Sequence, residues 1–259
     1  MFCFWPVWRW YAARLTDGSD EPWGIAALVA ALLLTWPKRH GWALRTDDRL
    51  LWVAALLTFA YAAVVPFAPP LVRAALAMAA LACSWVSIAG LRSKLAPVMV
   101  LFALSLPVIA SLQFFLGYPL RAITTAGSAL TLQLVGFDVE RSGTALLWQG
   151  HTVLVDAPCS GVRMLWTGAA LACVVVLYRD SMRWRSLMTL LLLSGVAALF
   201  ANVLRAAALF VLETRDAPVP ELLHTGVGAA TSALTAVSIV LIESALRRMR
   251  PSMQPVAHA

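Results

Sequence analysis

The sequence predicts an all-α polytopic membrane protein with about seven transmembrane helices and a small extracytoplasmic insertion made of one helix and a β-meander. Of the 259 residues, 61% are hydrophobic and only 13% are charged, whereas about 25% of the residues of an ordinary soluble domain are charged. The apolar residues form runs close to the roughly 20 residues that a helix needs to cross a bilayer. We therefore expect a single integral membrane domain over residues 1–259, divided into N-terminal helices (22–116), an insertion (117–160), a second group of helices (161–246) and a tail (247–259).

The positive charge of the chain is more typical of a membrane protein than of a nucleic-acid-binding protein. The formal net charge is +7, from 20 Lys and Arg against 13 Asp and Glu. The basic residues lie in short stretches between the apolar runs, as they do in the loops of membrane proteins. We expect contact with the lipid bilayer and no nucleic acid partner.

Seven apolar runs with charged flanks are predicted to cross the membrane. The first run has only 14 residues, so it could instead be re-entrant or gain interfacial length from the tryptophans before it. No cleaved signal peptide is expected, because the N-terminus lacks a basic region followed by a continuous apolar stretch. The predicted spans cover residues 23–36, 50–67, 71–89, 95–116, 161–178, 187–212 and 222–246.

The distribution of basic residues predicts the orientation, because positively charged connections stay on the cytoplasmic side. Twelve basic residues fall in one set of connections, and the other eight fall on the opposite face or just inside the spans. This distribution assigns the C-terminal tail to the cytoplasm and the insertion to the outside. The twelve are Lys38, Arg39, Arg45, Arg49, Arg92, Lys94, Arg179, Arg183, Arg185, Arg247, Arg248 and Arg250.

The insertion is predicted to be structured. Residues 122–135 are suited to a short helix at the membrane surface. Residues 137–155 alternate polar and apolar side chains, with turn signals at Ser142-Gly143 and Gln149-Gly150. This alternation predicts a small three-stranded meander.

The four cysteines indicate neither a metal site nor a disulfide. They lie in or beside apolar segments and lack the paired spacings of zinc ligands. We therefore expect no metal and no cofactor. Cys3, Cys83 and Cys173 are predicted to pack as small apolar residues.

Cys159 is the candidate nucleophile. It directly precedes a predicted span, and Pro158 and Ser160 beside it favour a helix start. The partial positive charge of a helix N-terminus, with Arg163 one turn on, would lower the pKa of this thiol. Asp156 could cap the helix or orient a catalytic imidazole. The alternatives are a Cys159 that only packs and an Arg163 that extends to lipid headgroups.

Arg205 lies inside a predicted span, where a charge is costly enough to suggest a function. Gly195, Ala198 and Asn202 share its helical face and form a stripe of small residues that allows a second helix to approach. This face is expected to point into the bundle. The alternative is an arginine that extends to the headgroups.

His224 opens the last span and begins a second stripe of small and polar residues at helical spacing. An isolated histidine at a helix end is often only an interfacial residue. The predicted orientation, however, places Cys159, Arg205 and His224 near the outer face together. The residues that follow His224 in the stripe are Gly228, Thr231, Thr235 and Ser238.

These three side chains have the chemistry needed for acyl transfer. Cys159 would attack a peptide carbonyl, and His224 would take the thiol proton and protonate the leaving amine. Arg205 would stabilise the tetrahedral oxyanion or hold a substrate carboxylate. His151 and Asp156 could orient or replace His224, although His151 is predicted to be an exposed strand residue.

Three segments resemble motifs of the exosortase/archaeosortase family: APCSGVR at 157–163, NVLR at 202–205 and HTGVG at 224–228. The resemblance covers about residues 122–245. It carries the conserved Cys, Arg and His of the family over onto Cys159, Arg205 and His224. The histidine is more similar to the bacterial exosortase branch, because archaeosortases usually have arginine there.

The resemblance implies a cysteine transpeptidase or protease in the bacterial plasma membrane, with its catalytic helices over 161–246. Such enzymes cleave the C-terminal sorting signals of exported proteins through a thioacyl intermediate, on the extracytoplasmic side. The implied substrates end in a short recognition motif of the Pro-Glu-Pro type, a transmembrane helix and a basic cluster. The sequence identifies neither the acyl acceptor nor the cognate motif.

Two alternatives stay open from the residues themselves. A non-enzymatic transporter or assembly scaffold would use Arg205 and His224 to line a polar path. An intramembrane protease would release the same tail by hydrolysis and would use the same residues as a transpeptidase.

Overall fold

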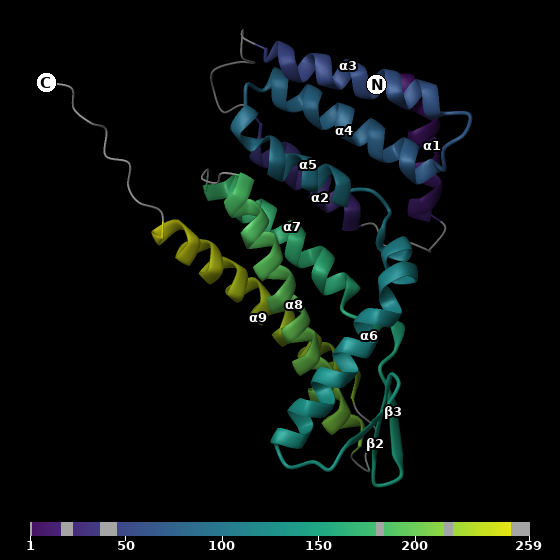
Figure 1. Ribbon diagram of the computed structural model, residues 1–259, viewed down its shortest axis with the longest axis vertical. Helices are drawn as coiled ribbons and strands as arrows, with labels where there is room; N and C mark the ends of the chain where they lie inside the picture. Colours follow the sequence, from purple (N-terminus) through teal and green to yellow (C-terminus); the bar gives the residue numbers. More distant parts are fainter. Residues whose placement is uncertain (1, 17–22, 37–45, 180–183, 215–219, 250–259) are drawn as a thin grey trace, which may run out of the picture.

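The computed structural model describes residues 2–16, 23–36, 46–179, 184–214 and 220–249, and it is mostly helical (Figure 1). The α-helices are α1 (Trp5–Thr16), α2 (Trp23–Leu34), α3 (Asp48–Val64), α4 (Pro70–Ile88), α5 (Leu95–Leu104), α6 (Ile109–Leu134), α7 (Val162–Arg179), α8 (Trp184–Glu213) and α9 (Glu221–Arg248). Three short 3-10 helices are η1 (Phe2–Phe4), η2 (Arg92–Lys94) and η3 (Ala157–Cys159).

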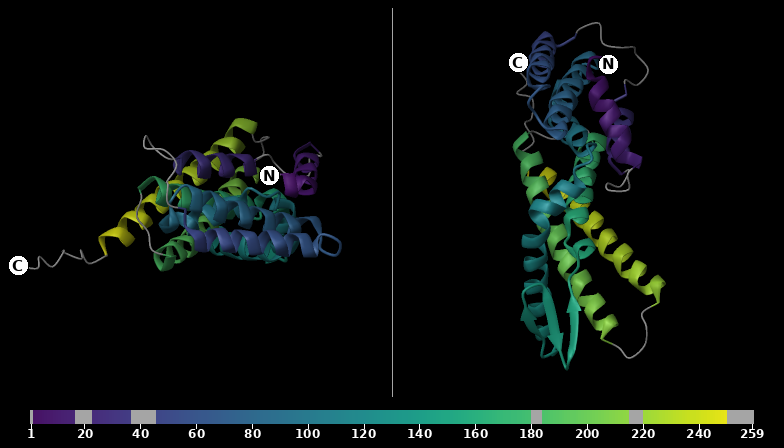
Figure 2. Two further views of the ribbon diagram at one scale, coloured as in Figure 1. Left: turned by 90° about the horizontal axis from the view of Figure 1, so that it is seen from above. Right: turned by 90° about the vertical axis from the view of Figure 1, so that its right-hand side faces the viewer.

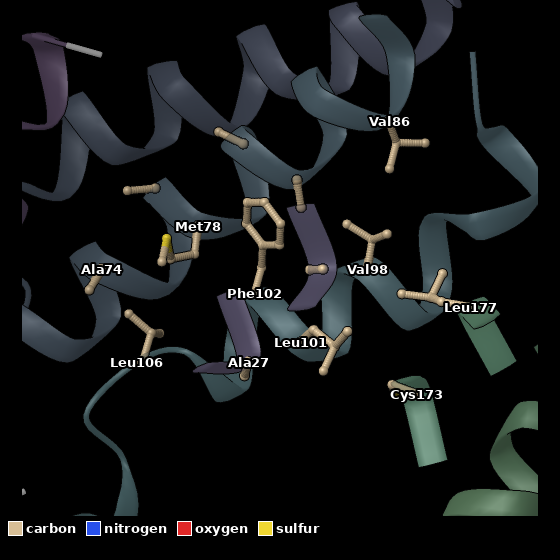
Figure 3. Close-up of a cluster of buried hydrophobic side chains, with 14 of the residues drawn as sticks. Ala27, Ala74, Met78, Val86, Val98, Leu101, Phe102, Leu106, Cys173 and Leu177 are labelled. Carbon is tan, nitrogen blue, oxygen red and sulfur yellow. The ribbon is translucent and has the colours of Figure 1, made fainter. Parts of the chain in front are cut away.

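The helices form two groups that share one core. Helices α1–α5 lie together at one end of the molecule, and α6, α8, α9 and the sheet extend away from them (Figures 1 and 2). Helix α7 joins the groups, because Cys173 and Leu177 of α7 pack in the same apolar cluster as Val98 and Leu101 of α5 (Figure 3). Cys173 therefore packs as a small apolar residue, as predicted.

Four helices of the described structure, α4, α7, α8 and α9, are long and apolar enough to cross a membrane. The pair formed by α5 and α6 makes a fifth if it is counted as one broken span, and α2 is apolar but has only 12 residues. The chain is thus a multi-pass membrane protein, while the predicted number of seven spans is not confirmed.

The predicted span over residues 95–116 is not one continuous helix, because the chain bends by 89° between α5 and α6. Pro107 lies in the bend, and a proline has no backbone N–H and disfavours helical geometry in the residue before it. The two carbonyls freed at the end of α5 find side-chain donors. Trp166 Nε1 donates to Leu104 O at 3.1 Å, and Tyr11 Oη donates to Ser105 O at 2.8 Å.

The short helix predicted over 122–135 is the second half of α6, so the predicted boundary at residue 117 falls inside a helix. Packing on α8 explains why α6 continues through Pro119. A Cβ placed on Gly127 would lie 2.8 Å from Val203 Cγ2, and Ser128 Oγ donates to Val203 O at 3.0 Å. Only a glycine permits the two helices to approach this closely.

The predicted three-stranded meander is confirmed. Strands β1 (Glu140–Ser142), β2 (Ala145–Trp148) and β3 (His151–Leu154) pair antiparallel in the order β1-β2-β3. The second turn has positive φ at both Gln149 (47°) and Gly150 (83°), as tight hairpin turns require. Val139 and Leu146 pack with Phe210 of α8, which fixes the sheet against the C-terminal end of this helix.

Candidate functional site

Cys159 lies in η3, one short turn before α7. Gly161 follows it with a φ of +88°, and its carbonyl accepts the Leu165 N–H at 2.9 Å, so α7 begins only at Val162. The prediction that Cys159 occupies the helix N-terminus is therefore wrong. The N–H of Cys159 instead donates to Asp156 O at 2.9 Å within η3.

The charge environment of the Cys159 thiol also differs from the prediction. Burial raises its pKa above the ordinary value of 9.0, the Arg205 guanidinium lowers it, and the Asp156 and Glu213 carboxylates raise it further. The net effect is a raised pKa instead of the lowered one expected. Because a thiol with a pKa of 9 is only about 1% ionised at pH 7, Cys159 rests as the neutral thiol.

Arg163 and Asp156, the two charged residues predicted to lie near this thiol, are both exposed. Arg163 is exposed on the first turn of α7 and is not among the charges that shift the pKa of Cys159. Asp156 is exposed and makes no capping hydrogen bond with its side chain. The acidic residue that sequence reasoning missed is Glu213 at the end of α8, which gave no signal because it lies 54 positions from Cys159 in the chain.

Arg205 is the described residue whose positive charge reaches Cys159. It is half-buried on α8, and a Cβ placed on Gly228 of α9 would lie 3.9 Å from its Cζ. Its Nε is buried and has no hydrogen-bond partner among the described residues. Because buried donors are nearly always paired in native proteins, this N–H is a candidate donor to a group outside the described residues.

His224 lies in the first turn of α9 and is exposed. It precedes Gly228 by one helical turn, so it shares the face of α9 that meets Arg205. Thr231 and Thr235 of the same stripe are buried. Across the described part of the chain, however, the imidazole of His224 makes no hydrogen bond to Cys159 or Arg205.

Asn202 holds the backbone of the nucleophile. Its side chain is 1% exposed, and Nδ2 donates to Cys159 O at 2.9 Å and to Thr124 Oγ1 at 3.0 Å. A Cβ placed on Gly161 would lie 3.0 Å from the same nitrogen. Asn202 therefore fits against the loop directly, and its buried neighbour Ala198 shows that the predicted stripe on α8 points into the bundle.

Gln113 of α6 holds the same loop from another side, and sequence reasoning missed it. Its Nε2 donates to Ala157 O at 3.0 Å, and its Oε1 accepts from Ser160 Oγ at 2.9 Å. The only signal in the sequence was a single amide within an apolar run, which hydropathy alone does not connect with residue 159.

Among the described residues, the other cysteines and His151 make no hydrogen bond with Cys159. Cys83 is buried as predicted, whereas Cys3, also predicted to pack as a small apolar residue, is exposed. His151 is exposed on β3 and stacks on Trp148, with ring centroids 6.4 Å apart. Within the described ranges, no three His, Cys, Asp or Glu side chains come together as metal ligands would.

The site thus combines a thiol, a guanidinium whose Nε has no partner among the described residues, and two backbone donors that are already engaged. The N–H groups of Cys159 and Ser160 are bonded to Asp156 O and Ala157 O, at 2.9 and 3.2 Å. In this conformation these two N–H groups do not point to a further acceptor, whereas the positive charge of Arg205 acts on the thiol.

Comparison with known proteins adds one finding. A family model described as transmembrane exosortase (Exosortase_EpsH) matches residues 13–241, which is most of the chain. No curated protein and no solved structure matches the chain.

Proposed function

Because the chain belongs to the transmembrane exosortase family, we propose that it is a membrane-embedded cysteine transpeptidase or protease that cleaves the C-terminal sorting signals of exported proteins. The proposed catalytic residues are Cys159, Arg205 and His224. The family supports a sorting enzyme in general terms, and the geometry around Cys159 supports the particular roles.

One observation carries the proposal: the buried Arg205 Nε has no partner among the described residues, and its side chain acts on the thiol of Cys159. A buried donor without a partner costs about 1–3 kcal/mol, so such an atom is retained where a ligand or an intermediate uses it. A peptide oxyanion formed by attack of Cys159 is a suitable acceptor. Removing one such donor typically lowers kcat by about 10²–10³.

The reaction begins with transfer of the thiol proton to the imidazole of His224. The sulfur attacks the scissile carbonyl carbon, the C–S bond forms, and the carbonyl electrons move to the oxygen, which accepts hydrogen bonds from Arg205. The oxyanion then collapses, the C–N bond breaks, and the imidazolium protonates the leaving amine. A thioester remains on Cys159 until an acceptor amine or water attacks it and the thiol is restored.

The raised pKa of Cys159 gives the base a necessary role. With an ordinary value of 9.0 raised further by burial, little thiolate is present at neutral pH, so a base must remove the proton when the substrate binds. His224 is exposed in the first turn of α9, on the face that meets Arg205. A histidine has the pKa range suited to this task.

We place the site on the extracytoplasmic side of the bacterial plasma membrane, with the C-terminus in the cytoplasm, from the distribution of basic residues. The proposed partners are exported proteins with a C-terminal recognition motif of the PEP-CTERM type, a transmembrane helix and a basic cluster. A substrate helix in the bilayer would present the peptide beside it at a fixed depth, which favours attack by a thiol at that depth.

The test is coexpression of tail-bearing proteins with the wild-type enzyme, Cys159→Ala and the matched control Cys173→Ala, in which a core thiol is removed. Immunoblotting should show a smaller product with wild type and Cys173→Ala only. Mass spectrometry of the new C-terminus then separates transfer to an acceptor from hydrolysis. Unprocessed bands in all three strains, across several correctly inserted tails, would instead favour a transporter or assembly scaffold.

A further inference from the structure

The loop that carries Cys159 is held on both sides of the thiol by one side chain. The amide of Gln113 donates to Ala157 O, two residues before Cys159, and accepts from Ser160 Oγ, one residue after it, at 3.0 and 2.9 Å. The hydroxyl of Ser160 is also placed to accept the Val162 N–H, at 3.4 Å, where α7 begins. Gln113 thus connects η3 with the start of α7.

We propose that Gln113 is a positioning residue, which holds the Cys159 loop in the geometry for attack without touching the substrate. This inference rests on the proposed cysteine chemistry. An uncharged amide provides a donor and an acceptor side by side, and the loop presents one acceptor and one donor to it. An ionised glutamate would lack the donor, and a methionine of similar length would lack both.

The bend between α5 and α6 makes this contact possible. Helix α6 starts at Ile109, directly after the 89° bend, and Gln113 lies in its first turns. A straight continuation of α5 would direct these residues elsewhere. Trp166 of α7 donates to Leu104 O at the bend. Helix α7, which follows Cys159, therefore stabilises the bend that places α6 and Gln113 beside the Cys159 loop.

A second helix fixes a different atom of the same loop. Asn202 of α8 donates to Cys159 O at 2.9 Å, while Gln113 bonds the residues on either side. The loop is therefore held at three residues, Ala157, Cys159 and Ser160, from two helices. Loss of Gln113 should leave it attached through Asn202, so the expected effect is a misplaced thiol in a folded protein.

The experiment compares Gln113→Met with Gln133→Met in the full-length protein, in a Cys3→Ser background that removes the exposed thiol. Gln133 is a matched control, because it lies on the same helix and its Nε2 also donates to a backbone carbonyl, Val139 O, at 2.8 Å. Steady-state processing and the rate of Cys159 alkylation by iodoacetamide are measured for each variant.

Gln113→Met is expected to lower kcat about tenfold with little change in KM, because attack depends on the position of the thiol. Alkylation of Cys159 should become several-fold faster, since a released loop exposes the sulfur. A lower kcat together with faster alkylation would indicate that the Cys159 thiol is misplaced. Cys83 and Cys173, which are buried, should stay unmodified, whereas general unfolding would expose them.

A double-mutant cycle tests the bond itself. Ser160→Ala removes one partner of Gln113, so the double variant Gln113→Met/Ser160→Ala should lose less than the product of the two single losses. Wild-type kcat and alkylation in Gln113→Met, or an equal loss in Gln133→Met, would overturn the positioning role. Failure of the proposed function would give a different result. Processing would then persist in Cys159→Ala, while the difference in Cys159 alkylation between Gln113→Met and Gln133→Met would remain.

Discussion

Removing the charge of Arg205 should make Cys159 less reactive, and this outcome is independent of any substrate. The structure gives the sign: burial raises the pKa of the thiol above 9.0, and the guanidinium opposes this increase. Arg205→Met therefore raises the pKa further, and the fraction of thiolate at a given pH falls. Arg205→Lys keeps the charge and should keep most of the reactivity.

The size of the effect follows from the position of the arginine. An opposite charge within about 4–6 Å typically lowers a pKa by 1–3, and Arg205 is only half-buried, so solvent weakens its field. We expect the lower end of that range. Since alkylation requires the thiolate, Arg205→Met should slow it about tenfold at pH 8.

The assay is alkylation of the full-length protein in detergent across pH 7–11, with the modified residue identified by mass spectrometry. In the wild type, the midpoint should lie above the ordinary value of 9.0, and in Arg205→Met it should lie higher still. Arg163→Met is the control, because Arg163 is nearer to Cys159 in sequence but is exposed, so solvent screens its charge.

Processing measured in the same variants separates the effect of the positive charge at position 205 from the effect of the planar guanidinium group. Arg205→Lys lacks the planar group with several fixed donors, so it should keep alkylation within about threefold while processing falls about a hundredfold. Unchanged or faster alkylation in Arg205→Met would show that the guanidinium does not act on Cys159. An equal decrease in Arg163→Met would refute the assignment to Arg205.

Three further predictions, tested by four variants and one control, follow from the structure. Asp156→Asn and Glu213→Gln each remove a charge that raises the pKa of Cys159, so alkylation at pH 8 should increase a few-fold in each; slower alkylation would contradict the charge assignment. Gly161→Ala places a Cβ at a residue with a φ of +88° and 3.0 Å from Asn202 Nδ2, so it should destabilise the protein by about 2–4 kcal/mol. The control is Gly143→Ala, which has a φ of +61° and open space around it and should destabilise the protein by only about 1 kcal/mol. Thermal unfolding measures both. Glu243→Gln removes the buried carboxylate that pairs with Arg179 at 2.5 Å and should lower the unfolding free energy by about 1–3 kcal/mol; equal stability would show that the pair between α7 and α9 contributes nothing.

Much of the fold could be predicted because hydropathy and turn chemistry are local signals. The helices α4, α7, α8 and α9 and the two turns of the meander were all indicated by nearby residues. The bend at Pro107 was not, because a single proline barely changes the hydropathy of an apolar run although it removes a backbone donor. The continuation of α6 past Pro119 depends on packing against α8, which no local pattern contains.

In the candidate site, too, features with a local sequence signal could be predicted, and features that depend on packing could not. Helical spacing predicted that Asn202 shares the inward face of Ala198, and a positive charge at Arg205 was a strong signal in an apolar span. The predicted direction of the Cys159 pKa was wrong because burial of the thiol raises the pKa more than the charge of Arg205 lowers it. Gln113 and Glu213 could not be found, since their relation to Cys159 exists only after the helices pack.

The contacts of the Ser105 carbonyl show that the N-terminal helices cannot be removed without changing the bend at the end of α5. Tyr11 of α1 donates to it, and a Cβ on Gly24 of α2 would lie 2.3 Å from it, so both N-terminal helices brace the end of α5. A fragment that begins at α6 would retain every proposed site residue yet lose this brace. The N-terminal helices, although generic in sequence, are therefore part of the working unit, and chimeras between relatives should exchange them together with the bend that they support.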